Sequence, residues 1–191
     1  MSIRELILKN RTFRRFYEDH LIERKDLESL VDLARLSASA ANLQPLKYRI
    51  SFEAESNSRI FPHLSWAGYL SDWPGPSQGE RPSAYIVVLL DTTISATIDC
   101  DHGIASQHIT LGAVEMGLGC CIISAVDRQG LKKDLKLPEK YKILLVIAVG
   151  KPKERVLIDP ISEDGDVKYW RDEKKYHHVP KRLLKDIILD E

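Results

Sequence analysis

The spacing of apolar residues changes along the chain, and each change predicts a different element. Between Leu27 and Ala34, apolar side chains recur at the i, i+3, i+4, i+7 spacing of an amphipathic helix. From Lys47 to Ala54 the period becomes two, which predicts a strand with one apolar face. The runs Ala84–Leu90, Cys120–Ser124 and Tyr141–Val149 are apolar almost throughout and fit buried core strands. Helices and strands therefore alternate along the chain.

The stretch from Asp101 to Gly117 has the length of a helix and is apolar on most of its circumference. Between Asp101 and Asp127 the only residue with a formal charge is Glu115. A helix of this kind is buried, either inside the domain or partly by a partner chain. His102 and His108 lie six residues apart on it and do not share a face, so we expect satisfied core or interface histidines rather than a metal pair.

Shorter signals complete the expected order of elements. Ser2–Glu5 is a capping-box pattern that opens a short helix, and Asp127 can cap another through Leu135. Glu55–Pro82, rich in proline and glycine, reads as short helix and loop. Val167–Arg171 is expected to be an extended arm, and Pro180–Leu189 a final helix.

Composition narrows the class of protein. The 191 residues suit one domain, and Lys plus Arg (28) equals Asp plus Glu (28), so nothing indicates a nucleic-acid tail or a basic membrane patch. No N-terminal apolar run resembles a signal peptide, and no run approaches the ~20 apolar residues of a membrane span. Three cysteines without a CxxC motif argue against a disulfide framework, and the adjacent Cys120 and Cys121 are expected to be small core residues. We expect a cytoplasmic protein.

The stretch Ser37–Pro45 is the first candidate for chemistry. Its side chains are small except for Leu43 and two amides, Asn42 and Gln44. Small residues let backbone N–H groups approach a ligand, and each amide offers donors and an acceptor. The pyrimidine end of a flavin is a sensible guest. The alternative is a helix end capped by serine and asparagine.

A second candidate is Asn10–Phe16, which gathers three arginines and the hydroxyl of Thr12 next to a helix end. Guanidinium groups there could bind an anion through bidentate contacts. The alternative is a solvated basic turn anchored by Phe13 and Phe16.

Three aromatic residues, Trp66, Tyr69 and Trp73, lie in the irregular segment and suggest a lid over a site. They could instead seal a core edge or a subunit interface. His177 and His178 are adjacent, and neighbours in sequence rarely converge on one metal, so no metal site is assigned. No GxGxxG motif supports a dinucleotide fold.

Taken in order, these motifs resemble the nitroreductase family of FMN-dependent oxidoreductases. Asn10–Phe16 is similar to that family's opening Arg-Arg-Ser-x-Arg-x-Phe, and Ser37–Leu46 to its Ala-Pro-Ser-x-x-Asn-x-Gln-Pro-Trp. Asp101–Gln107, followed by Gly117–Gly119, is similar to its Asp-x-Gly-x-Ala-x-Gln helix and Gly-Leu-Gly turn, and Val146–Pro152 to its last core strand. The resemblance spans most of the chain.

The resemblance implies a single α+β domain over residues 1–191, with a three-layer α/β/α arrangement, a central and mostly antiparallel sheet, and an interlocked homodimer. It assigns the FMN phosphate, the ribityl chain or the ring edge to Arg11, Thr12 and Arg14. Contacts with FMN from the partner subunit fall to Ala38, Ser39, Ala40, Asn42 and Gln44. The isoalloxazine ring would lie along Ile122, Ile123 and Ser124, and the phosphate would meet Lys181 and Arg182.

The activity that the resemblance implies is electron transfer from NAD(P)H, through FMN, to a nitroaromatic, a quinone or a similar small acceptor in a ping-pong hydride mechanism. No side chain need act as nucleophile or base, and Arg14 is the candidate stabiliser of the flavin edge. Asn10, Ala38 and Leu46 depart from the family motifs. Two alternatives stay open: the same fold acting on one specific metabolite or with oxygen, and a flavin-binding or interaction protein without turnover.

Overall fold

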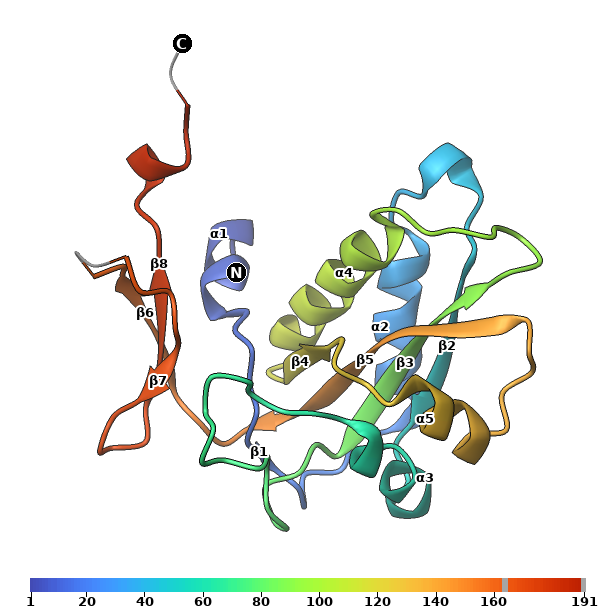
Figure 1. Ribbon diagram of the computed structural model, residues 1–191, viewed down its shortest axis with the longest axis horizontal. Coiled ribbons are helices and arrows are strands. Elements are labelled where there is room, and N and C mark those ends of the chain that lie inside the picture. Colours follow the sequence, from blue (N-terminus) through green and yellow to red (C-terminus); the bar gives the residue numbers. More distant parts are fainter. Residues whose placement is uncertain (163–164, 190–191) are drawn as a thin grey trace.

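A five-stranded sheet forms the body of the protein (Figure 1). The computed structural model describes residues 1–162 and 165–189. The strands of this sheet are β1 (Phe16–Tyr17), β2 (Leu46–Ser51), β3 (Ala84–Asp91), β4 (Gly119–Ile123) and β5 (Tyr141–Pro152). The order β1-β5-β3-β2 holds along the sheet, β4 also pairs with β5, and every one of these pairings is antiparallel.

Helices cover both faces of this sheet. They are α1 (Ile3–Lys9), α2 (Arg24–Arg35), α3 (Ala54–Ser58), α4 (Asp101–Glu115) and α5 (Arg128–Asp134). Figure 1 shows α2 and α4 side by side on one face, and α5 with α3 on the other. The expected α+β fold with three layers and a mostly antiparallel sheet is therefore confirmed.

The alternation of side chains along β3 and β5 creates two separate cores. Ile86 and Ile147 face α2 and α4, whereas Val87 and Val146 face the layer that contains α5. All eight residues of β3 are buried, as a strand covered on both faces requires. Cys120 belongs to the first core and Cys121 to the second, so the expectation that both are core residues is confirmed.

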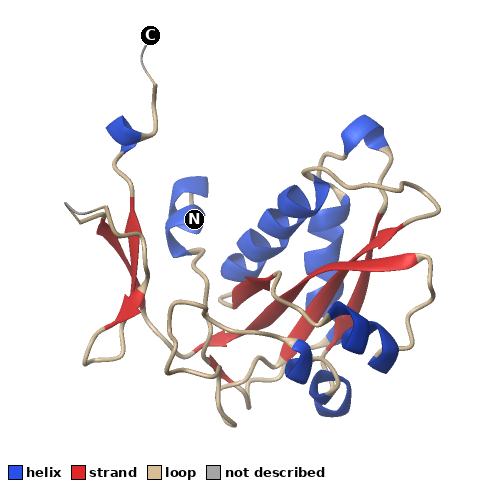
Figure 2. Cartoon of the chain, viewed as in Figure 1, coloured by secondary structure: helices blue, strands red, loops and turns tan. Residues whose placement is uncertain are grey.

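A second, smaller sheet stands apart from the body beside α1 (Figures 1 and 2). It consists of β6 (Val156–Pro160), β7 (Trp170–Arg171) and β8 (His177–Lys181). β6 runs parallel to the central β8, and β7 runs antiparallel to it. We call this unit the C-terminal sheet. The chain leaves it as a tail that leads away from the body, with a 3-10 turn at Leu184–Asp186.

Two sequence predictions about element boundaries are wrong. The strand expected to reach Ala54 ends at Ser51, because α3 begins at Ala54. The helix expected over Pro180–Leu189 does not form, because β8 continues through Lys181 and leaves only a 3-10 turn beyond it. So short a segment has too few helical hydrogen bonds to repay nucleation without a packing surface.

Several local signals were interpreted correctly. Ser2 caps α1 through the expected capping box, and the side chain of Asp127 accepts a hydrogen bond from the backbone N–H of Gly130 at the start of α5. Gly117 follows α4 with φ +71°, as a glycine C-cap requires. Val167–Arg171 is extended only at its end, in β7. Within the described residues, none of the helices has the length and apolar character needed to cross a membrane.

Candidate functional site

A cavity of about 380 Å³ lies where the end of α1, helix α4, strand β4 and the C-terminal sheet meet. This volume falls within the range of small-molecule sites. The residues that line it are Asn10, Arg11, Thr12, Arg14, Gln107, Thr110, Cys120, Ile122, Val156, Tyr169, His177, Val179 and Lys181. Three segments that are far apart in the sequence thus line the same cavity: the basic N-terminal motif, the middle of α4 and the C-terminal sheet.

Backbone pairing places the N-terminal motif against β4. Thr12 forms a bridge with Cys120, and the N–H of Phe13 donates to the carbonyl of Cys120 at 2.9 Å. Asn10, the C-cap of α1, donates through Nδ2 to Oγ1 of Thr110 on α4 at 2.8 Å. The departure at Asn10 therefore links two helices at the cavity wall instead of adding a cation.

The cavity is strongly basic. Arg11, Arg14 and Lys181 line it, and the described part of its lining contains no acidic residue. The Nη2 of Arg11 donates to the carbonyl of Ile7 at 2.8 Å, but its Nε is buried with no hydrogen-bond partner among the described residues. Burial lowers the pKa of Arg11. An unpaired buried donor beside a cavity indicates a site that an anionic ligand would complete.

Arg14 is held by two residues of the C-terminal segment. Its Nη1 lies 3.0 Å from Nε2 of His177, and its guanidinium carbon lies 4.5 Å from the ring centroid of Tyr169. His177 is fully buried, and Tyr169 also packs against the His177 ring, with 5.1 Å between centroids. Burial, together with the charges of Arg14 and Arg171, lowers the pKa of His177 to about 4.

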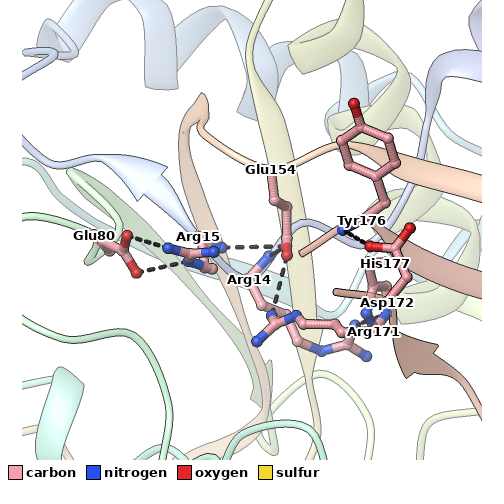
Figure 3. Close-up of polar contacts among 8 residues, drawn as sticks. All are labelled: Arg14, Arg15, Glu80, Glu154, Arg171, Asp172, Tyr176 and His177. Carbon is pink, nitrogen blue, oxygen red and sulfur yellow. Dashed lines mark hydrogen bonds and ion pairs between the residues drawn. The ribbon is translucent and has the colours of Figure 1, made fainter. Parts of the chain in front are cut away.

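A buried carboxylate attaches the C-terminal sheet to the N-terminal motif. The side chain of Glu154 is 1% exposed and accepts hydrogen bonds from the backbone N–H groups of Arg14 and Arg15. Its other oxygen pairs with Nη2 of Arg171 at 3.1 Å. Figure 3 shows Glu154 beside Arg14 and Arg15 of the N-terminal motif and Arg171 of the C-terminal sheet. Arg171 in turn lies over the ring of Trp73, at 4.3 Å.

The residues predicted from Ser37–Pro45 lie elsewhere in this chain. A turn at Ala40–Asn42 lies close to the N-terminal end of α4 (Figure 1). The predicted residues form or flank this turn: Ala38, Ser39, Ala40, Asn42 and Gln44. None of them lines the cavity.

Asp101 anchors this turn: its carboxylate accepts from Oγ of Ser39 at 2.5 Å and from the N–H of Ala40 at 3.1 Å. The cavity residue Gln107 is six residues further along α4, about 9 Å along the helix axis. Asn42 and Gln44 are exposed and have φ of +55° and +53°, strained values for residues other than glycine. Contact of these residues with a flavin therefore remains a prediction about the partner subunit.

Of the residues predicted on β4 and at the end of β8, some line the cavity and others do not. Ile122 lines the cavity and is 43% exposed, whereas Ile123 points into the opposite core and Ser124 lies beyond the strand. Lys181 lines the cavity, and Arg182, the next residue, is exposed outside it. Their roles toward a cofactor remain predictions.

The three aromatic residues proposed as a lid do not line the cavity. Trp66 packs against the second core with Phe61. Tyr69 contacts Tyr169, with 5.0 Å between ring centroids, and Trp73 contacts Arg171. The last two residues therefore support the C-terminal sheet from outside, and a lid role for all three remains a prediction.

Sequence reasoning did not include several cavity residues among the site residues. Gln107 is the last residue of the Asp101–Gln107 motif, so the sequence did contain a signal for this cavity residue. Tyr169 and His177 carry no local signal, since they reach Arg14 only through the pairing of β7 and β8. His102 and His108 were expected to be satisfied core or interface histidines. Each has a buried Nδ1 with no partner among the described residues, so the core alternative is wrong and the interface alternative stays a prediction.

Comparison with known proteins shows similarity to one family. The model of the Nitroreductase family matches residues 83–151. A protein of Archaeoglobus fulgidus, named as an NADH dehydrogenase/NAD(P)H nitroreductase, is 26% identical over 150 residues, which cover 73% of this chain and 80% of that protein.

Solved structures agree on the fold. A Parabacteroides distasonis protein, described as an NADH dehydrogenase/NAD(P)H nitroreductase, is 25% identical with a TM-score of 0.65, over 80% of this chain and 88% of its own. An Exiguobacterium sibiricum protein, described as a nitroreductase in complex with FMN, is 16% identical with a TM-score of 0.67, over 81% and 90%. At that identity the likeness shows the fold alone. The resemblance to the nitroreductase family is therefore confirmed, because that family's model matches residues 83–151 and proteins described as nitroreductases share the fold over about four fifths of the chain.

Proposed function

We propose that this protein is an FMN-dependent oxidoreductase that takes electrons from NAD(P)H and passes them to a small acceptor such as a nitroaromatic or a quinone, in a ping-pong sequence. The name of the Archaeoglobus relative, the FMN complex of the Exiguobacterium neighbour and an FMN-dependent nitroreductase of Clostridium difficile support this proposal. The two alternatives, a reaction on one metabolite or with oxygen and flavin binding without turnover, are outcomes of the tests below.

The observation that carries the proposal is the composition of the cavity. Its lining combines cationic and polar residues, Arg11, Thr12 and Lys181, with the apolar residues Ile122 and Val179. Cationic side chains suit an anionic phosphate, and apolar side chains suit a flat ring. The unpartnered Nε of Arg11 supplies a donor that a phosphate oxygen would satisfy. The residues present therefore fit FMN.

In this proposal Arg11, Thr12 and Lys181 would hold the phosphate, and Ile122 would support the ring. When bound, FMN supplies hydride acceptance and release, with negative charge developing along one ring edge on reduction. Arg14 would supply a fixed positive charge able to stabilise that negative charge. Apart from Arg14, the protein contributes orientation and exclusion of water, and no side chain acts as nucleophile or base.

The proposal includes a homodimer. An apolar groove of about 290 Å³ runs between α1, α2 and α4 and is lined by Leu6, Leu33, Leu36 and Leu111. The unpartnered Nδ1 of His108 belongs to a residue in the same groove. In this homodimer a second copy would cover the groove, and Ser39, Asn42 and Gln44 would contact the FMN of the partner subunit, as the family resemblance implies. Sedimentation equilibrium of the purified protein tests this, and a monomer at micromolar concentration would contradict it.

The visible absorption spectrum of the gently purified protein is the first test, repeated after FMN is added and the excess removed. A bound-flavin spectrum with about one FMN per chain is expected from one cavity per chain. A colourless protein that retains no FMN would overturn the proposal. Oxidation of NADH and NADPH above the free-flavin rate, with nitroaromatics and quinones as acceptors, then separates turnover from flavin binding alone.

The variant Arg14→Ala tests the role of the cavity arginine. Loss of a charged hydrogen-bond donor is expected to weaken FMN retention by about ten- to a hundredfold, or to make the flavin harder to reduce. Arg24→Ala, which removes an exposed arginine paired with Glu28 on α2, is the matched control. Unchanged FMN occupancy and reduction potential would remove Arg14 from this role.

A further inference from the structure

Three arginines around Glu154 are held by different partners. Arg15 donates through Nε to Glu80 at 2.6 Å and pairs with the other oxygen of that carboxylate. Arg171 pairs with Glu154. The guanidinium of Arg14, in contrast, has no carboxylate partner among the described residues. The fold therefore neutralises two of these cations and leaves the third, which lines the cavity, without a counter-charge.

The partner that Arg14 does have is a neutral acceptor. A guanidinium can only donate, so the contact of 3.0 Å between Nη1 and Nε2 requires that Nε2 of His177 carry no proton. The hydrogen of the imidazole then lies on Nδ1, which has no partner among the described residues. Burial and the charges of Arg14 and Arg171 hold the pKa of His177 at about 4, which keeps this ring neutral in ordinary buffers.

Tyr169 restricts Arg14 from a second direction. Its ring lies 4.5 Å from the guanidinium carbon, a cation–π contact that fixes the plane of the group without removing its charge. The hydroxyl of Tyr169 accepts from the backbone N–H of Tyr69 at 3.4 Å, which ties the ring to the loop outside the sheet. The remaining side-chain N–H donors of Arg14 have no hydrogen-bond acceptor among the described residues, and Arg14 lines the cavity.

We propose that His177 is a positioning residue: as a neutral acceptor on the C-terminal sheet it orients Arg14 toward the cavity while leaving the arginine's full positive charge available to an anionic group of the bound cofactor. The inference rests on the proposed function, because the ligand it concerns is FMN. The anionic group is either the phosphate or the ring edge that becomes negative on reduction. A carboxylate in place of the imidazole would orient Arg14 equally well but would cancel its charge.

The protonation state can be tested without any flavin. In ¹⁵N–¹H correlation spectra of the purified full-length protein, His177 is expected as the neutral Nδ1–H tautomer at pH 7. The His177→Gln spectrum identifies its signals by their absence. A protonated ring, or the Nε2–H tautomer, would overturn the inference whether or not the protein binds FMN.

Three substitutions separate orientation from charge. His177→Gln keeps a neutral acceptor and is expected to retain most of the FMN affinity. His177→Leu removes the acceptor and is expected to weaken FMN binding about tenfold. His177→Glu keeps an acceptor, but its carboxylate neutralises the positive charge of Arg14. This variant is therefore expected to weaken FMN binding at least as much as His177→Leu and to make the flavin harder to reduce. His178→Gln, on the same strand but outside the cavity lining, is the control for damage to the sheet.

Parallel titrations with FMN and riboflavin identify the anionic group. A penalty for His177→Glu with FMN alone indicates the phosphate, and a penalty with both indicates the ring edge. If all three variants lose affinity in step with their thermal stability, His177 is only structural and the inference is wrong. If the variants all bind FMN as the unmodified protein does, the inference fails while the proposed function stands. If the unmodified protein binds no flavin, both fail.

Discussion

The two sheets of this protein are built by different forces. Every residue of β3 in the body is buried, and the strand lies between two apolar cores. In the C-terminal sheet, His177 is the only described strand residue that is fully buried, and Ile158 on β6 is 42% exposed. The body is therefore stabilised mainly by apolar area removed from water, and the C-terminal sheet is not.

Charged and aromatic contacts take over in the C-terminal sheet. His178 lies between Asp159 and Asp172, with ring-nitrogen to oxygen distances of 2.6 and 3.4 Å, and its ring stacks on Trp170 at 4.1 Å. Glu154 connects this sheet to the body. A unit held by a few polar contacts opens more readily than an apolar core. Since the same unit completes the cavity wall, the cofactor site borders the part of the fold that we expect to open first.

Substitutions of isoleucine in the two sheets should give the largest contrast. Ile147 is fully buried between β5 and the helices, so Ile147→Ala is expected to lower the free energy of unfolding by about 4 kcal/mol. Ile158→Ala, the matched change in β6, is expected to cost less than about 1 kcal/mol. Urea denaturation followed by circular dichroism measures both. Equal losses would mean that the two sheets unfold as one unit stabilised in the same way.

Removal of the charge on Glu154 should release the C-terminal sheet from the body. In Glu154→Gln the guanidinium of Arg171 loses its carboxylate and an amide NH₂ meets donors, which is expected to cost about 3 kcal/mol of local stability. Limited proteolysis should then cut within residues 155–181 while the body stays intact. The control is Glu139→Gln, since the side chain of Glu139 is almost fully exposed in its pair with Lys132. Cleavage unchanged from the unmodified protein would contradict the anchoring role.

The sequence predicts the body well because buried strands and helices require apolar residues in regular patterns. The apolar runs at Ala84–Leu90 and Tyr141–Val149 correspond to β3 and β5, and Gly117 marks the end of α4. The C-terminal sheet leaves no such record. Its strands have two to five residues, and Pro180 lies within β8, where a helix was expected. Pairing partners far apart in the sequence determine this sheet, and no periodicity encodes them.

The candidate site divides along the same line. Arg11, Thr12, Arg14 and Lys181 line one cavity, and their contact with a cofactor stays a prediction. The contact between Arg14 and His177 joins positions 163 residues apart, and the sequence offered His177 only as half of an unconvincing metal pair. Local motifs indicate which residues meet a ligand, whereas the residues that orient them follow from tertiary packing.

The two adjacent histidines of β8 predict opposite pH dependences for the opening of the C-terminal sheet. Burial opposes a charge on His178, but hydrogen bonds to Asp159 and Asp172 outweigh it and raise the pKa of His178. A raised pKa contributes stability that is complete below the unfolded value of about 6.5 and is lost as pH rises through the folded value. The pKa of His177 is lowered to about 4, so its contribution is lost as pH falls from about 6.5 toward 4.

The sheet should therefore be most stable near pH 6.5, and hydrogen exchange of the β8 amides can measure this. Between pH 6.5 and pH 5 the opening free energy is expected to fall by about 1.5 kcal/mol, because the open-state imidazole of His177 is already half protonated at pH 6.5 and becomes fully protonated below it. A smaller loss is expected at pH 8.5. His177→Gln should remove the acid loss and His178→Gln the alkaline loss, whereas amides of β3 should follow neither. A profile shared by β3 and β8 would show that the sheets open together and would contradict the division of the molecule into two units. A β8 profile that does not change with pH would contradict the assignment to these histidines. Each ring lies close to charged groups that shift its pKa: Arg14 and Arg171 for His177, and Asp159 and Asp172 for His178.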